Sequence, residues 1–151
     1  MKNLTRAVLF TFAAVALVGA AQQGTATDKK SSVTSIDDLK FTPLDAKNPD
    51  GPQMAPAWGD PWTGPTSIYL KLKPGANPLH SHSSDYHAVV VKGRARHWDA
   101  GSDEKSARIV GPGSSWYQPG NAVHGDACVG PDDCVIYLTL SGKFDFIPAA
   151  K

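Results

Sequence analysis

Turn-forming residues interrupt the second half of this chain about every ten residues, which leaves room for short strands but not for long helices. Between the turns, apolar and polar residues alternate; Ile68, Leu70 and Leu72, for example, share one face of an extended segment. No part of residues 66–148 shows the apolar period of an amphipathic helix. We therefore predict an all-β domain over residues 66–148, built from roughly six to eight short strands in a sandwich or barrel.

Length and charge narrow the class of protein further. The chain has 151 residues, the size of one domain, and 41% of them are hydrophobic, which suffices for a globular core. The formal net charge is +1, and the sequence contains no basic run, phosphate-binding glycine loop or internal repeat. We therefore expect no nucleic-acid partner.

The N-terminus has the pattern of a targeting segment. Lys2 and Arg6 precede Ala7–Ala21, an uncharged apolar run that ends in small residues. This arrangement is typical of a secretory signal peptide, which we place at residues 1–21. The run is shorter than the ~20 residues of a membrane-spanning helix, so an uncleaved anchor is the less favoured alternative. We expect a periplasmic or secreted protein with no membrane attachment after cleavage.

Two cysteines flank a short turn. Cys128 and Cys134 enclose Val-Gly-Pro-Asp-Asp. In an oxidising compartment, two cysteines at such a spacing favour a disulfide. Metal binding by a thiolate pair is the alternative, but the spacing does not match Cys-x-x-Cys and the chain has no second pair.

The region between the signal peptide and the β domain divides in two. Residues 22–42 are polar, and we expect them to be flexible. Residues 43–65 contain six prolines, which favour extended chain over helix or central strand. We predict a Pro-rich arm there. Its two tryptophans, Trp58 and Trp62, suggest that the arm packs on the core or on a partner subunit.

Histidines gather at one point of the predicted sheet. His80, His82 and His87 lie just before or within the start of a buried apolar run, and they are three of the chain's five histidines. His80 and His82 project to the same face of an extended strand because they are two residues apart. If the strand containing His124 pairs beside them, three imidazoles converge. Imidazole binds zinc, iron, copper, nickel and manganese, so we predict a divalent metal site.

Two motifs give these histidines a context. The first comprises Gly75, His80-Ser81-His82 and Gly93, and the second comprises Gly113 and the run Pro119–His124. In residue types and spacing they resemble the two motifs of the cupin superfamily, the RmlC-like jelly rolls. The resemblance implies a single cupin double-stranded β-helix, or jelly-roll barrel. It also implies metal binding by His80 and His82 together with His124.

A narrower resemblance rests on "WGDP", "PLHSHSSDYHAVVVKG" and "GKFDFIP". These segments are similar to an uncharacterised single-domain cupin family, a domain of unknown function (DUF4437-like). Such a resemblance implies a fold and a metal site rather than a reaction.

The chain departs from the first cupin motif at its glutamate. The sequence has one glutamate, Glu104, which lies in the polar loop between the motifs. Counting forward from the His-x-His pair places His87 at the glutamate position, whereas counting back from Gly93 places Tyr86 there. The two counts differ by one residue, and adjacent residues of a strand project from opposite faces. We favour His87 as the fourth ligand because tyrosine must lose a proton with a pKa of about 10. Asp85 is a further candidate.

Other residues are candidates for a pocket near the metal. They are Tyr86, Asp85, Trp116 and Gln118, with Tyr117 beside them. His97 is expected to be an ordinary strand residue. Asn121 replaces the inner glycine of the second motif, and asparagine tolerates the left-handed backbone that glycine often adopts.

The resemblance implies a function only in outline. We expect an exported metal-binding cupin that is a metal-dependent small-molecule enzyme of dioxygenase, hydrolase or isomerase type. The alternative is a non-catalytic cupin that binds or senses a small ligand through its metal. The expected partners are a small-molecule substrate or ligand and, as in many cupins, a second copy of the chain in a homodimer. No catalytic residue is assigned.

Overall fold

The computed structural model describes residues 30–150. The predicted signal peptide and the first part of the predicted flexible segment lie outside these residues. From Thr34 onwards the chain forms one compact unit. Within residues 30–150, no helix is long and apolar enough to cross a membrane.

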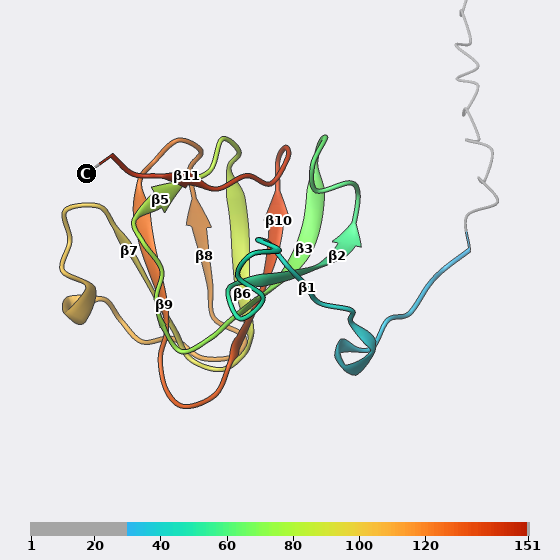
Figure 1. Ribbon diagram of the computed structural model, residues 1–151, viewed down its shortest axis with the longest axis horizontal. Helices are drawn as coiled ribbons and strands as arrows, with labels where there is room; N and C mark the ends of the chain where they lie inside the picture. Colours follow the sequence, from blue (N-terminus) through green and yellow to red (C-terminus); the bar gives the residue numbers. More distant parts are fainter. Residues whose placement is uncertain (1–29, 151) are drawn as a thin grey trace, which may run out of the picture. The chain divides into compact units, whose positions relative to one another are not determined.

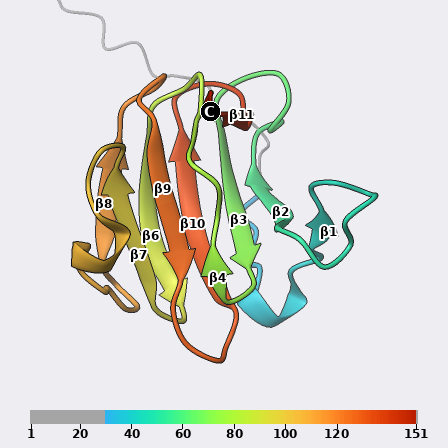
Figure 2. The same cartoon turned by 60° about the vertical axis from the view of Figure 1, so that its left-hand side comes forward.

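Two antiparallel sheets make up the fold (Figures 1 and 2). The larger sheet has the order β1 (Thr42–Pro43), β2 (Gln53–Trp58), β3 (Thr66–Leu72), β10 (Cys134–Leu140), β6 (Tyr86–Lys92) and β8 (Ser115–Gln118). The smaller sheet has the order β11 (Ile147–Pro148), β5 (His80–Ser81), β9 (His124–Cys128) and β4 (Gly75–Ala76), and β7 (Ala95–Asp99) also pairs with β9. Two 3₁₀ turns, η1 (Ile36–Asp38) and η2 (Glu104–Ser106), complete the described elements. The predicted all-β class is confirmed.

The core lies between the two sheets. Its buried residues come from the larger sheet, mainly from β3, β6 and β10, and from the smaller sheet through Ala95 and Cys128, with Phe144 added from the segment between β10 and β11. Alternation decides which side chains reach this core. In β3, Ile68 and Leu72 are buried and Leu70 packs against the core, as the sequence pattern predicts.

Four of the eleven strands in residues 30–150 contain only two residues. They are β1, β4, β5 and β11. A two-residue strand has no detectable period, so sequence alternation indicates only the longer strands. Between η2 and β8, Val110 forms an isolated bridge with Ala95.

The predicted Pro-rich arm is not confirmed as a separate element. Its residues from Gln53 to Trp58 form β2, which pairs with β3 in the larger sheet. Prolines are tolerated there because β2 lies near the sheet edge and its register shifts between Pro56 and Trp58. Trp58 and Trp62 remain largely exposed in the single chain, although Trp62 contacts the ring of Phe144 edge-on at 6.3 Å.

The predicted disulfide between Cys128 and Cys134 is present and joins the ends of β9 and β10. The turn between β6 and β7 passes directly against it. Gly93 in this turn has a φ of +82°, and a Cβ added there would lie 2.9 Å from both the Cys134 Sγ and the Asp133 carbonyl oxygen. Glycine is therefore required at this motif position by both backbone conformation and space.

We expect Gly93→Ala to lower the free energy of unfolding by about 2–4 kcal/mol, from the positive φ together with overpacking. Gly101→Ala is the matched control because its φ is +89° but nothing lies within 4 Å of the added Cβ. The control should lose only about 1–2 kcal/mol. Urea unfolding of both variants measures the difference, and equal losses would contradict the packing argument.

Candidate metal centre

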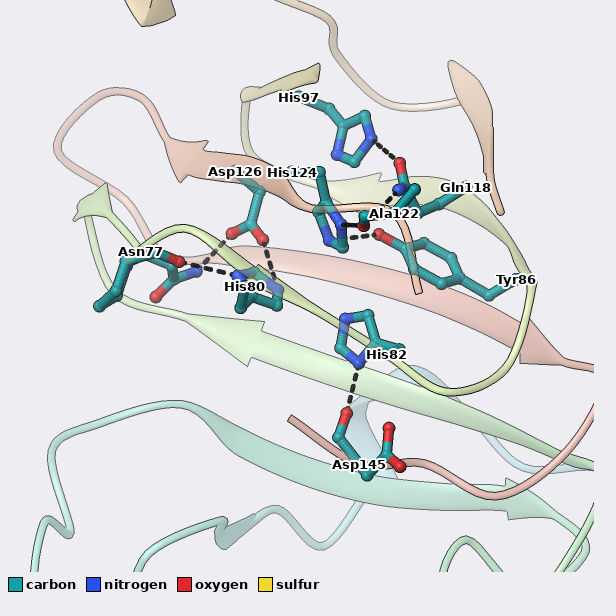
Figure 3. A network of polar contacts seen from close by, with 11 residues as sticks. Asn77, His80, His82, Tyr86, His97, Gln118, Ala122, His124, Asp126 and Asp145 are labelled. Atoms are coloured by element: carbon teal, nitrogen blue, oxygen red, sulfur yellow. Dashed lines mark hydrogen bonds and ion pairs between the residues drawn. The ribbon is translucent and has the colours of Figure 1, made fainter. Parts of the chain in front are cut away.

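Three histidines from two distant segments meet inside the barrel. His80 in β5 is the direct cross-strand partner of His124 in β9, and His82 follows β5. All three side chains are buried. One ring nitrogen from each lies within 4.8 Å of the others, so the group could hold a metal ion (Figure 3). We call these three residues the histidine cluster.

Backbone carbonyls orient every ring of the cluster. The Nδ1 of His80 is 2.8 Å from the Pro78 oxygen, and the Nδ1 of His124 is 3.1 Å from the Ala122 oxygen. The Nδ1 of His82 bonds to the carbonyl of Asp145 in the same way. A carbonyl only accepts, so each Nδ1 carries a hydrogen, and in the neutral form of each ring Nε2 is the nitrogen with the lone pair. This is the tautomer in which Nε2 can bind a metal.

Burial keeps two rings of the cluster, those of His80 and His82, neutral. Removal from water lowers the pKa of His80 to about 4, against the hydrogen bond from its Nδ1, which raises it. The same cause lowers the pKa of His82 to about 4. At neutral pH these rings therefore carry no proton that a metal would have to displace. The donor set of three imidazoles with converging ring nitrogens fits a divalent ion.

Tyr86, not His87, occupies the inward position after the His-x-His pair. Its hydroxyl donates to the Nε2 of His124 at 3.2 Å, and burial raises the pKa of the phenol. His87 is exposed on the outer face of β6, where its ring lies 5.0 Å from that of Tyr117. The expectation that His87 joins the cluster is therefore corrected, because the two residues occupy opposite faces of one strand.

Trp116 and Gln118 come from β8 and face the barrel interior. Trp116 stacks on the ring of His97, with centroids 4.9 Å apart. The Nε2–H of His97 donates to the Gln118 Oε1 at 2.9 Å. Contrary to the expectation of an ordinary strand residue, the His97 ring lies within the barrel, 5.0 Å from that of His124. The sequence did contain a signal for this position. His97 lies two residues after the buried Ala95 in β7, so the two side chains share one face of the strand.

Asp85 lies outside the barrel interior. Its exposed carboxylate accepts a hydrogen bond from the Gly120 N–H at 2.7 Å, and a Cβ on Gly120 would lie 2.8 Å from the Ser83 oxygen. Asn121, which follows, has the predicted left-handed backbone with a φ of 61°. Its N–H donates to the His82 carbonyl at 2.7 Å. Hydrogen bonds from the backbone of the second motif therefore help to hold the first motif in position.

Sequence reasoning missed Asp126. Its Oδ2 lies 3.5 Å from the His80 Nε2, and the side-chain amide of Asn77 donates to its Oδ1 (Figure 3). Burial raises the pKa of this carboxyl group. The available signal was its position two residues after His124, because residues at that spacing share a strand face.

The C-terminal segment was also missed as part of the site. Besides the Asp145 carbonyl, it contributes two aromatic rings to the cluster. Phe146 stacks on His80 with centroids 4.3 Å apart, and Phe144 lies 5.6 Å from the ring of His82. This segment therefore packs against two of the three cluster histidines.

A cavity of about 530 Å³ adjoins the cluster. Polar side chains of His80, His82, Tyr86 and Asp126 line one part of it. Apolar side chains line much of the remainder: Leu70, Leu72, Trp116, Ile136, Leu138, Phe144 and Phe146. The loop between β1 and β2, in the predicted Pro-rich region, contributes Leu44 and Pro52. Of the predicted pocket residues, Tyr86 and Trp116 line the cavity.

Comparison with known proteins identifies the fold. No family model matches the chain, and no curated protein matches its sequence. Among solved structures, an RmlC-like cupin from Shewanella frigidimarina NCIMB 400 is 15% identical, with a TM-score of 0.53 over 81% of this chain and 95% of that one. A protein with a double-stranded β-helix domain from Klebsiella pneumoniae is 17% identical, with a TM-score of 0.59 over 85% and 99%.

An enzyme is also among these structures. The polyketide cyclase RemF from Streptomyces resistomycificus is 16% identical, with a TM-score of 0.60 over 81% of this chain and 87% of that one. The predicted cupin double-stranded β-helix is thereby confirmed as the fold. The narrower resemblance to one uncharacterised cupin family stays a prediction.

We expect the metal-free protein to lose stability as the pH falls from about 6.5 to about 4. In this window the unfolded chain protonates histidines 80 and 82, whose folded pKa values are about 4. Stability is therefore greatest above pH 6.5 and is lost on acidification, by at most about 3 kcal/mol per histidine. Urea unfolding with a chelator measures the slope. His82→Gln should have a shallower slope, and an unchanged slope would contradict this assignment.

Proposed function

We propose that this protein is an exported, metal-dependent enzyme that acts on a small molecule bound in the barrel cavity. One observation carries the proposal: three buried, carbonyl-oriented imidazoles meet beside a cavity large enough for a small organic ligand. The occurrence of an enzyme, the polyketide cyclase, among the similar structures supports it.

The histidine cluster would hold the metal through its Nε2 atoms. Zinc, iron, manganese, copper and nickel all suit imidazole ligands, so the donor set does not select one of them. When bound, the ion supplies Lewis-acid chemistry: it polarises a substrate oxygen or lowers the pKa of a bound water.

The chain's own residues would bind and orient the substrate. Tyr86 lines the cavity and keeps its proton, since burial raises its pKa, so its hydroxyl can donate a hydrogen bond to a substrate oxygen. The aliphatic and aromatic walls would hold the apolar part of the substrate and exclude water. Dioxygenase, hydrolase and isomerase types all remain compatible with this arrangement.

We expect His82→Ala to reduce the metal content of the purified full chain to background, because it removes one of three converging ligands. His87→Ala is the matched control: its imidazole is exposed on the outer face, so metal content should match that of the wild type. Elemental mass spectrometry measures both. Metal loss in His87→Ala, or full metal content in His82→Ala, would overturn the proposed ligand set.

Metal identity bears on the reaction type. Protein purified from its native compartment should be analysed, because recombinant metal content can reflect the growth medium. Zinc alone would count against oxygen chemistry, whereas iron, copper or manganese would favour it. Stable binding of metal and ligand without turnover would instead indicate the non-catalytic binding or sensing alternative.

Export is proposed from the N-terminal pattern, with support from the disulfide, since disulfides persist in oxidising compartments. We expect protein recovered from the periplasm or the medium to begin just after Ala20 or Ala21, which N-terminal sequencing tests. An intact N-terminus on the protein in the cytoplasmic fraction would contradict export. The homodimer stays a prediction.

A further inference from the structure

We propose that Asp126 is the fourth protein ligand of the metal, and that it replaces the carboxylate which the first cupin motif of this chain lacks. The inference rests on the metal-binding function proposed above. It adds a ligand from the strand of the second motif, two residues after His124.

The position of Asp126 follows from the sheet. His124 and Asp126 project to the same face of β9, and His80 is the cross-strand partner of His124. The Asp126 Oδ2 therefore comes within 3.5 Å of the His80 Nε2. Two atoms that bind one ion tetrahedrally with bonds of about 2.1 Å lie about 3.4 Å apart, so this separation suits an ion shared with His80. The set of mutually close ligand atoms comprises the three histidines, so the Asp126 carboxylate must move closer to at least one of the other two rings to join them.

The two facing atoms are both acceptors. The Nδ1–H of His80 donates to the Pro78 carbonyl, so its Nε2 presents a lone pair to the carboxylate oxygen. Such an arrangement is repulsive unless a cation lies between the two atoms. A proton held there would also relieve the repulsion, and the experiment below separates it from a metal by a metal-specific spectrum.

Asn77 holds the carboxylate in this orientation. Its side-chain amide donates to the Asp126 Oδ1, and its backbone N–H donates to the Asp126 carbonyl at 2.9 Å. These two contacts leave Oδ2 facing His80. Ligating carboxylates are commonly oriented by such outer hydrogen bonds.

Other acidic or phenolic groups near the motifs are already engaged. Asp145 accepts from the N–H and hydroxyl of Ser83 at 2.8 and 2.6 Å. Asp85 accepts from Gly120, at the surface. Tyr86 keeps its proton because burial raises its pKa, so its phenol is a poor ligand. Within residues 30–150, Asp126 is thus the carboxylate that lies 3.5 Å from a cluster nitrogen, the His80 Nε2, and also lines the cavity.

The test is metal binding by Asp126→Asn in the full chain, at pH 7.5. The amide keeps the size of the side chain and an acceptor for Asn77, but removes the charge and the strong ligand oxygen. Asp132→Asn is the matched control, since it makes the same substitution at an exposed position in the β9–β10 turn. Competition with a chelator gives the Zn²⁺ affinity, and the visible absorption of bound Co²⁺ reports the ligands.

We expect Asp126→Asn to lose more Zn²⁺ affinity than the roughly 10–100-fold lost when an outer partner of a ligand is removed, and to change the Co²⁺ band positions and intensity. Asp132→Asn should match the wild type in both measurements. Asn77→Ala, a milder change, should weaken binding within the smaller range and leave the Co²⁺ bands close to those of the wild type.

Two failures are distinguishable. If the wild type binds ions and Asp126→Asn binds them with the same affinity and spectrum, Asp126 is not a ligand, and the three-histidine centre stands. If the folded wild type binds no ion, the proposed function itself fails. Circular dichroism of each metal-free variant confirms that it is folded, and Asn77→Ala keeps the inference testable if Asp126→Asn does not fold.

Discussion

The candidate site depends on one backbone pairing, that of His80 with His124. The strand that contains His80, β5, is only two residues long, so it cannot hold its position through its own ladder. It is held between β9 and the two-residue β11, and the Ala149 N–H donates to the Leu79 carbonyl at 2.9 Å just before it. The geometry of the cluster is therefore determined by the smaller sheet as a whole rather than by the His-x-His segment.

The confusion between His87 and Tyr86 has a simple physical origin. Strand β6 runs from Tyr86 to Lys92, and its burial alternates strictly from Tyr86 to Val90, with a register shift only at its far end. Between His82 and Tyr86 the chain forms an irregular turn, and a count through it carries no information about strand faces. The motif glycine was thus the better reference point, because it directly follows the strand that contains Tyr86 and lies close against Cys134 of the disulfide.

Much of the fold and part of the site could be predicted from the sequence. Apolar and polar residues alternate along regular strands, and tight turns contain characteristic residue types. The positions of Ile68, Leu70 and Leu72 follow from that period, and the turn at Asn121 from its residue type. Contacts between remote segments have no such signature. The contact of Asp126 with His80 needs the strand register, and the role of Asn77 needs the path of the loop before β5.

The C-terminal segment shows how far the two motifs fall short of describing the site. Phe144 and Phe146 pack against cluster histidines and also line the cavity, while the carbonyl between them orients His82. A ligand large enough to fill the cavity would contact these rings as well as the cluster. Because one short segment both supports a metal-binding ring and forms the cavity wall, a change in its length or aromatic content would alter cavity shape and ring orientation together. The shape of the cavity and the orientation of the cluster rings are therefore physically coupled in this barrel through residues outside either motif.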